Sequence, residues 1–210
     1  MKFTELLDIV GNRPAFASPL LRAGDVDTTD LASQLSRWAA SGKLLQLRRG
    51  VYALAEQYRS RPPHPFEVAN LLERPSYVSL ESGLSHHGVI PESVFATTSV
   101  TTARAGEFDT PLGRYAYRHI GQSLFWGYVT ETIGGAEVLV ARPEKALLDL
   151  VYFRTGADRP AFLDELRLDT GGLDHAVLHE MARRTGKPKL MRAAENVSRL
   201  REAHGEWEQL

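Results

Sequence analysis

The segment 44–54 constrains the fold more than any other part of this chain. Two apolar, β-prone runs, 44–47 and 51–54, flank a short turn that contains two arginines and Gly50. Such a pattern predicts a β-hairpin. Because helical periodicity precedes it directly, the N-terminal part must combine helices with a two-stranded ribbon.

Three helices are expected before this hairpin. The first covers 4–10, the second follows Pro14 and ends near Gly24, and the third starts at Asp27 or Thr28. The apolar positions of the third helix recur at helical spacing: Leu31, Leu35, Trp38 and Ala39. Three helices followed by a hairpin is the order of a winged helix-turn-helix, a DNA-binding fold.

The third helix is expected to contact DNA with the face opposite its apolar positions. Small polar residues and one arginine lie there, and Ser, Thr, Gln and Arg side chains pair with base edges or phosphates. Arginines at a hairpin tip suit a narrow minor groove or phosphates. The alternative is a solvated helix face and turn. The expected DNA contacts are Thr29, Ser33, Gln34, Ser36, Arg37, Lys43, Arg48, Arg49, Arg59 and Arg61.

Charge is distributed unevenly along the 210 residues, although the formal net charge is only -1. Segments 31–61 and 183–201 are basic, and 157–180 is acidic, so local charge is more informative than the total. A helix over 188–203 is expected to carry a second basic patch for DNA or RNA. The alternative is a solvated amphipathic helix. The patch comprises Lys187, Lys189, Arg192 and Arg199.

Two domains are expected, 1–62 and 63–210. Residues 55–65 contain three prolines and no periodicity, which indicates a semi-rigid linker. The second domain shows helical patterns and strand-like runs, and Gly134-Gly135 predicts an antiparallel hairpin. The fold class is therefore α+β: an N-terminal winged helix-turn-helix, then a mixed α/β domain with a mainly antiparallel sheet and C-terminal helices. Helices are expected over 66–72, 80–87, 143–153, 161–166, 173–183 and 188–203, and strands over 94–102, 114–120, 126–132 and 137–140.

Several functional classes are disfavoured. The chain has no cysteine, so thiol nucleophiles, disulfides and thiolate zinc sites are excluded. No apolar run is long enough to span a bilayer, and the N-terminus is not a secretory signal, so we expect a cytoplasmic protein without a membrane partner.

We also expect no catalytic residue, no cofactor and no metal site. His86 and His87 are adjacent on a predicted helix, where neighbouring side chains point about 100° apart. His175 and His179 share a face but lack the glutamate of the metalloprotease helix. Ser79 is not in a nucleophile elbow, and we interpret it as the start of a helix capping box.

Four motifs in the second domain resemble one family. Residues 75–92 (PSYVSLESGLSHHGVIPE), 98–101 (TSVT), 110–113 (TPLG) and 142–150 (RPEKALLDL) resemble, in order and spacing, the AbiEi family of antitoxins. The resemblance covers almost the whole chain and weakens after about residue 157.

The resemblance implies a type IV antitoxin, a component of bacterial phage defence by abortive infection. The winged helix would repress the shared operon by binding double-stranded operator DNA, which we expect to be an inverted repeat bound by two copies. The C-terminal domain would neutralise a nucleotidyltransferase-type toxin without forming a stable complex with it. The alternative is a transcriptional regulator with a ligand- or protein-sensing C-terminal domain and no cognate toxin. Replacing both Arg48 and Arg49 by alanine is expected to abolish repression and to leave toxin neutralisation largely intact.

Overall fold

A computed structural model describes residues 1–22, 28–91 and 95–207 of the chain. The N-terminal module contains helices α1 (Phe3–Val10) and α2 (Thr28–Ala40), a 3-10 turn η1 (Ser18–Arg22), and strands β1 (Ala15–Ala17), β2 (Leu44–Arg48) and β3 (Val51–Leu54). The predicted first helix, third helix and hairpin are therefore confirmed. The predicted helix after Pro14 forms only in part: Ala15–Ala17 is strand β1, Ser18–Arg22 is the short 3-10 helix η1, and the predicted end near Gly24 lies outside the described residues.

Strand pairing explains this difference. β1 pairs antiparallel with β3, with Ala15 opposite Ala53 and Ala17 opposite Val51, which gives a three-stranded sheet in the order β1-β3-β2. A partner strand distant in sequence outweighs local propensity in short segments. One face of this sheet packs against α1 and α2 in a core that includes Leu6, Val10, Phe16, Leu31, Leu35, Leu44, Tyr52 and Leu54.

The rest of the chain forms a larger α/β unit. Its helices are α3 (Pro65–Leu72), α4 (Leu80–His86), α5 (Pro143–Phe153), α6 (Pro160–Glu165), α7 (His175–Thr185) and α8 (Pro188–Trp207), with 3-10 turns η2 (Glu56–Tyr58), η3 (Gln122–Leu124) and η4 (Thr170–Gly172). Its strands are β4 (Ser76–Val78), β5 (Ala96–Thr101), β6 (Gly106–Thr110), β7 (Gly113–His119), β8 (Tyr128–Ile133) and β9 (Ala136–Ala141).

The six strands form one mixed sheet in the order β6-β7-β5-β4-β9-β8. Over the described ranges, the chain thus has eight α-helices and two sheets, with five of the seven strand pairings antiparallel. This confirms the mixed α/β class and the mainly antiparallel pairing. β4 and β6 were not predicted. β4 has only three residues, and β6 is a polar edge strand with exposed Glu107 and Asp109.

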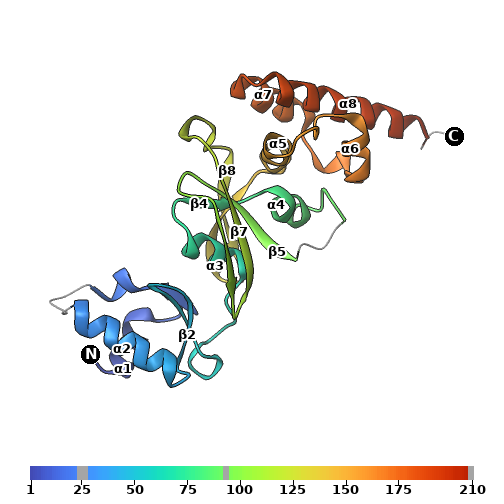
Figure 1. Ribbon diagram of the computed structural model, residues 1–210. Coiled ribbons are helices and arrows are strands. Elements are labelled where there is room, and N and C mark those ends of the chain that lie inside the picture. Colours follow the sequence, from blue (N-terminus) through green and yellow to red (C-terminus); the bar gives the residue numbers. More distant parts are fainter. Residues whose placement is uncertain (23–27, 92–94, 208–210) are drawn as a thin grey trace.

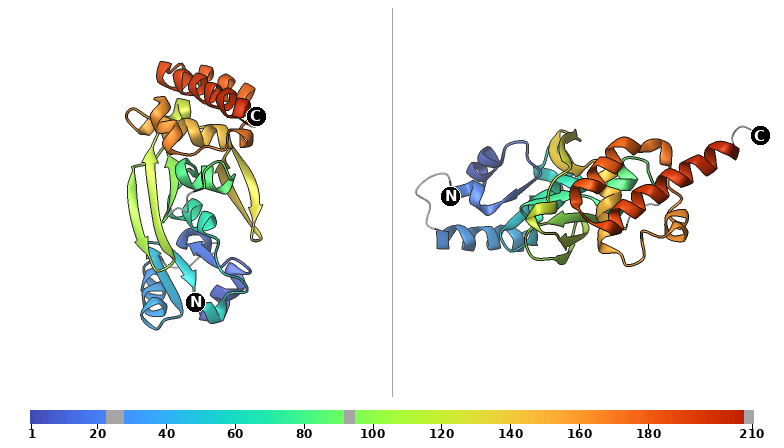
Figure 2. Two further views of the ribbon diagram at one scale, coloured as in Figure 1. Left: turned by 90° about the vertical axis from the view of Figure 1, so that its right-hand side faces the viewer. Right: turned by 90° about the horizontal axis from the view of Figure 1, so that it is seen from above.

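Each face of the large sheet contributes to a different core. Successive residues of a strand point to opposite faces, and accordingly Tyr77 packs with α4 and α5, whereas Val78 packs with α3. The small sheet also contacts the α3 side, through Leu47 and Val51. Figure 1 shows the N-terminal module at one end, the six-stranded sheet in the middle and α5 to α8 at the other end. Figure 2 shows from two other directions that α1 and α8 lie at opposite ends of the molecule.

The described part of the chain includes no helix with the length and apolar character needed to cross a membrane.

Candidate functional site

The outer face of α2 is the first part of the predicted DNA interface. Leu31 and Leu35 are buried against the small sheet, so the helix turns its opposite side outward. That side exposes Ser33, Ser36 and Arg37, as the apolar pattern predicted. Gln34 is half-buried, and its Nε2 donates to Asp30 Oδ2 at 2.6 Å. The side chain of Thr29 lies outside the described residues.

The hairpin tip separates its two arginines. The turn between β2 and β3 consists of Arg49 and Gly50, and Gly50 has φ +78°, a backbone conformation that suits glycine. Ser18 N donates to Gly50 O at 2.8 Å and holds the turn against the start of η1. Arg49 is exposed at this tip.

Arg48 points instead toward the large sheet. Its Nη1 donates to Glu73 Oε2 at 3.1 Å, and its guanidinium lies 5.3 Å from the centroid of the Phe108 ring. The predicted wing arginines therefore have different surroundings, because Arg48 is the last residue of β2 whereas Arg49 lies in the turn that follows. Contact of Arg48 with DNA stays a prediction, and such contact would require it to leave Glu73.

Two of the other predicted basic residues near the module, Arg61 and Lys43, also have partners within the chain. Arg61 makes a bidentate pair with Glu67, at 2.8 and 2.9 Å. The ammonium of Lys43 lies 5.0 Å from the centroid of the Phe3 ring. Arg59 is half-buried. The sequence predicted one continuous basic surface, whereas the structure leaves Arg37 and Arg49 as the exposed arginines of this set, with Arg48, Arg59 and Arg61 partly buried.

The second basic patch lies on α8 and the turn before it. Lys189 donates to the carbonyl of Arg154 at 2.7 Å, and Arg192 pairs with Asp158 at 2.9 Å. Arg199 donates to Asn196 Oδ1 at 3.4 Å, while Lys187 is exposed. Two of the four cations thus hold the segment that follows α5. A nucleic-acid contact by this patch stays a prediction.

A buried polar network joins β4 to α5, and the sequence analysis did not predict it. Asp149 accepts hydrogen bonds from Tyr77 Oη at 2.9 Å and Ser79 Oγ at 2.8 Å, and it pairs with Lys145. Lys145 also donates to Tyr77 Oη at 2.8 Å. The Ser79 hydroxyl therefore donates to Asp149 and does not cap α4, so the predicted capping box at the start of α4 is wrong. The available signal was Lys145 and Asp149 four residues apart within an apolar run.

This network lies in the interior of the protein. Tyr77, Ser79 and Asp149 are at most 2% exposed, so substrate has no access to the serine or the carboxylate. Burial lowers the pKa of Lys145 and raises that of Tyr77. Burial also acts to raise the pKa of Asp149, against the opposing effect of Lys145 and the two hydroxyls. Because each polar group has a partner, the network can specify how α5 sits on the sheet.

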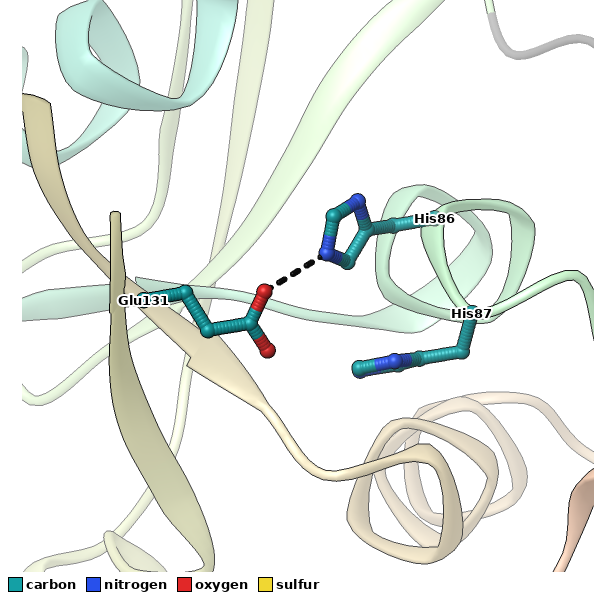
Figure 3. Close-up of side chains that lie close together, drawn as sticks. All are labelled: His86, His87 and Glu131. Atoms are coloured by element: carbon teal, nitrogen blue, oxygen red, sulfur yellow. Dashed lines mark hydrogen bonds and ion pairs between the residues drawn. The ribbon is translucent and has the colours of Figure 1, made fainter. Parts of the chain in front are cut away.

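The two adjacent histidines differ from the sequence-based expectation. α4 ends at His86, and His87 leaves the helix with φ −84° and ψ 3°. The rings therefore converge, with centroids 4.9 Å apart, and Figure 3 shows both of them on the side of Glu131. The argument that these side chains point apart on one helix is wrong. In contrast, His175 and His179 share a face as expected, and both lie within hydrogen-bonding distance of Ser198 Oγ, at 3.2 and 3.0 Å.

A pocket of about 750 Å³ opens between the large sheet and the C-terminal helices. Its wall is largely apolar, with Arg118 and Arg154 among its polar residues. Leu80 contributes to the wall and has φ +58°. This conformation is strained for leucine. The volume is in the range of small-molecule sites.

Comparison with models of known protein families finds no match, and a search of curated proteins finds no significant match. The resemblance described above therefore stays a prediction, and the function must be argued from the sites.

Proposed function

We propose that this chain is a DNA-binding repressor and an antitoxin of the AbiEi type, with an N-terminal winged helix-turn-helix. The order α1, β1, η1, α2, β2, β3 and the sheet order β1-β3-β2 support this fold. In this arrangement η1 and α2 correspond to the two helices of the helix-turn-helix. α2 is then the recognition helix, and the hairpin of β2 and β3 is the wing.

The exposed face of α2 carries the DNA-binding proposal. It presents short hydroxyl side chains and Arg37 to solvent, and α2 packs on β2, whose hairpin exposes Arg49 at its tip. A helix with such a face fits the major groove, where serine and arginine read base edges. An arginine at the wing tip fits the phosphates or the minor groove next to it.

Binding of the full chain to its own promoter region tests this proposal. Fluorescence anisotropy with a labelled duplex from that region, and with a scrambled duplex, gives specific and non-specific affinities. Arg37→Ala combined with Arg49→Ala is expected to weaken specific binding at least about tenfold, since each good base contact is worth about 1–3 kcal/mol. Arg104→Ala, an exposed arginine in the segment between β5 and β6, is the matched control and should bind normally.

Two results would contradict the proposal. Equal affinity for promoter and scrambled duplexes would contradict specific recognition of the promoter. Unchanged affinity of the double variant would contradict DNA binding by this face.

The antitoxin part of the proposal rests on the four motifs. Its test is growth of cells that express a nucleotidyltransferase gene neighbouring this one, with and without this chain. Rescue of growth by the Arg37→Ala, Arg49→Ala variant is expected, because neutralisation is assigned to the C-terminal domain. No rescue by the wild-type chain would disprove the antitoxin role.

The pocket beside Leu80 favours a second candidate, a transcriptional regulator that senses a ligand through its C-terminal domain. Strained backbone is often found at binding sites. This candidate requires that a small molecule raises the melting temperature and changes promoter affinity. It also requires that no nucleotidyltransferase gene lies nearby.

A further inference from the structure

Three potential metal ligands converge beside the large sheet, outside the proposed DNA interface. One ligand atom from each of His86, His87 and Glu131 lies within 4.8 Å of those of the other two. His86 Nε2 is 2.8 Å from Glu131 Oε2 (Figure 3). The histidines come from the end of α4, and Glu131 comes from β8.

The hydrogen bond of His87 determines which of its two ring nitrogens carries the hydrogen. His87 Nε2 lies 2.8 Å from the carbonyl oxygen of Ala141. A carbonyl oxygen only accepts, so Nε2 carries the hydrogen, and the Nδ1 lone pair of the neutral ring is left for a ligand. Metal-bound histidines commonly donate their second ring N–H to a carbonyl in this way, which orients the ring.

The donor set matches a particular class of metal. Two imidazoles with one carboxylate suit zinc and neighbouring transition metals, whereas calcium and magnesium prefer oxygen ligands alone. Ligand atoms around tetrahedral zinc are separated by about 3.3 Å, given metal–ligand distances of about 2.0–2.1 Å. Because the side chains of His86 and Glu131 are 26% and 29% exposed, they have space for the small rotations this needs.

We propose that His86 Nε2, His87 Nδ1 and the Glu131 carboxylate bind one divalent ion of the zinc class, with solvent at the fourth position. The ion takes the place of the hydrogen between His86 Nε2 and Glu131, and the hydrogen of the neutral ring moves to Nδ1. Because histidine and carboxylate ligands bind a metal only in their deprotonated forms, binding weakens in acid. The bound ion also links the end of α4 to β8. The proposed metal site does not depend on the proposed repressor function.

The experiment uses the full chain after removal of metals with a chelator. Zinc titration by calorimetry is expected to show one site per chain. Loss of a residue that only supports a metal ligand weakens metal affinity by about 10–100-fold. His87→Ala and Glu131→Gln each remove a proposed ligand, so each should weaken zinc binding by more than this. His119→Ala removes an exposed histidine outside the triad and serves as the matched control.

X-ray absorption of the zinc-loaded wild-type chain provides a test that does not depend on the folding of variants. Two imidazole ligands are expected around the ion. Absence of stoichiometric zinc binding, fewer than two imidazoles, or unchanged affinity in folded His87→Ala would each overturn the proposal.

Discussion

The pair formed by Lys145 and Asp149 is the residue-scale feature with the clearest energetic consequence. Both side chains are buried, and Asp149 also accepts from Tyr77 and Ser79. Lys145→Met would leave a buried carboxylate without its counter-charge, which costs about 3–5 kcal/mol of stability. Urea denaturation of the wild type and the variant measures this loss.

The double variant Lys145→Met, Asp149→Leu is the control for this prediction. It removes both charges, and replacing a whole buried pair by apolar residues is far milder than breaking it. We expect the double variant to be more stable than Lys145→Met alone. A double variant at least as destabilised as the single one would show that the charge pair is not the source of the loss.

His64 predicts a pH dependence of stability. Burial lowers the pKa of His64 below 6.5, and the neighbouring His86 lowers it further. Below about pH 6.5 the unfolded chain therefore binds more protons at this residue than the folded one, so this contribution to stability falls as the pH falls. In His64→Asn this contribution is absent, while an acceptor remains for Phe66 N at the start of α3.

Unfolding free energies at about pH 7.5 and about pH 5.5 test this, since free histidine titrates between them. The wild type is expected to lose more stability across this interval than His64→Asn. Equal losses in the two proteins would rule out His64 as the cause.

At the scale of elements, the two neighbouring arginines of the β2–β3 hairpin differ: Arg48 has a structural role, and Arg49 has a proposed role in DNA binding. Arg48 pairs with Glu73 and lies over Phe108, whereas Arg49 is exposed. We expect Arg48→Ala to reduce stability by about 1 kcal/mol, the size of a partly exposed ion pair with a cation–π contact. We expect Arg49→Ala to leave stability unchanged but to weaken promoter binding.

The salt dependence of DNA binding distinguishes the two arginines. The slope of log K against log salt is negative, and loss of one phosphate contact reduces its magnitude by about 0.9. Arg49→Ala should show this change, and Arg48→Ala should keep the wild-type slope. A changed slope in Arg48→Ala and an unchanged slope in Arg49→Ala would mean that Arg48 leaves Glu73 and contacts DNA.

Elements with strong local signals were predictable from the sequence, and those that depend on distant partners were not. The span of α5 follows from Pro143 and its apolar run, and the β8–β9 hairpin follows from Gly134-Gly135. In contrast, β1 forms because β3 lies beside it, and Arg48 is paired because α3 brings Glu73 near. The convergence of His86 and His87 depends on where α4 ends, and helix ends are weakly encoded.

On the scale of the whole molecule, the N-terminal module shares a core with the larger unit. Leu47, Val51 and Ala53 of the small sheet are buried together with Val68 and Leu72 of α3. Burying a leucine or valine contributes about 1.5–3 kcal/mol. A fragment that ends at residue 62 would expose these side chains to water, so the two modules should stabilise each other even though DNA recognition and the C-terminal function are assigned separately.

This shared core predicts one cooperative unfolding transition for the full chain. Trp38 lies in α2, and Trp126 lies beside the large sheet between η3 and β8, so each reports on one module. Trp126→Phe with Trp207→Phe leaves Trp38 as the reporter, and Trp38→Phe with Trp207→Phe leaves Trp126. We expect coincident urea midpoints from the two proteins, the standard indication of two-state behaviour.

Val51→Asp places a charge in the shared core and should separate the midpoints, with Trp38 reporting the earlier transition. Separate midpoints already without Val51→Asp would mean that the shared core does not couple the two modules.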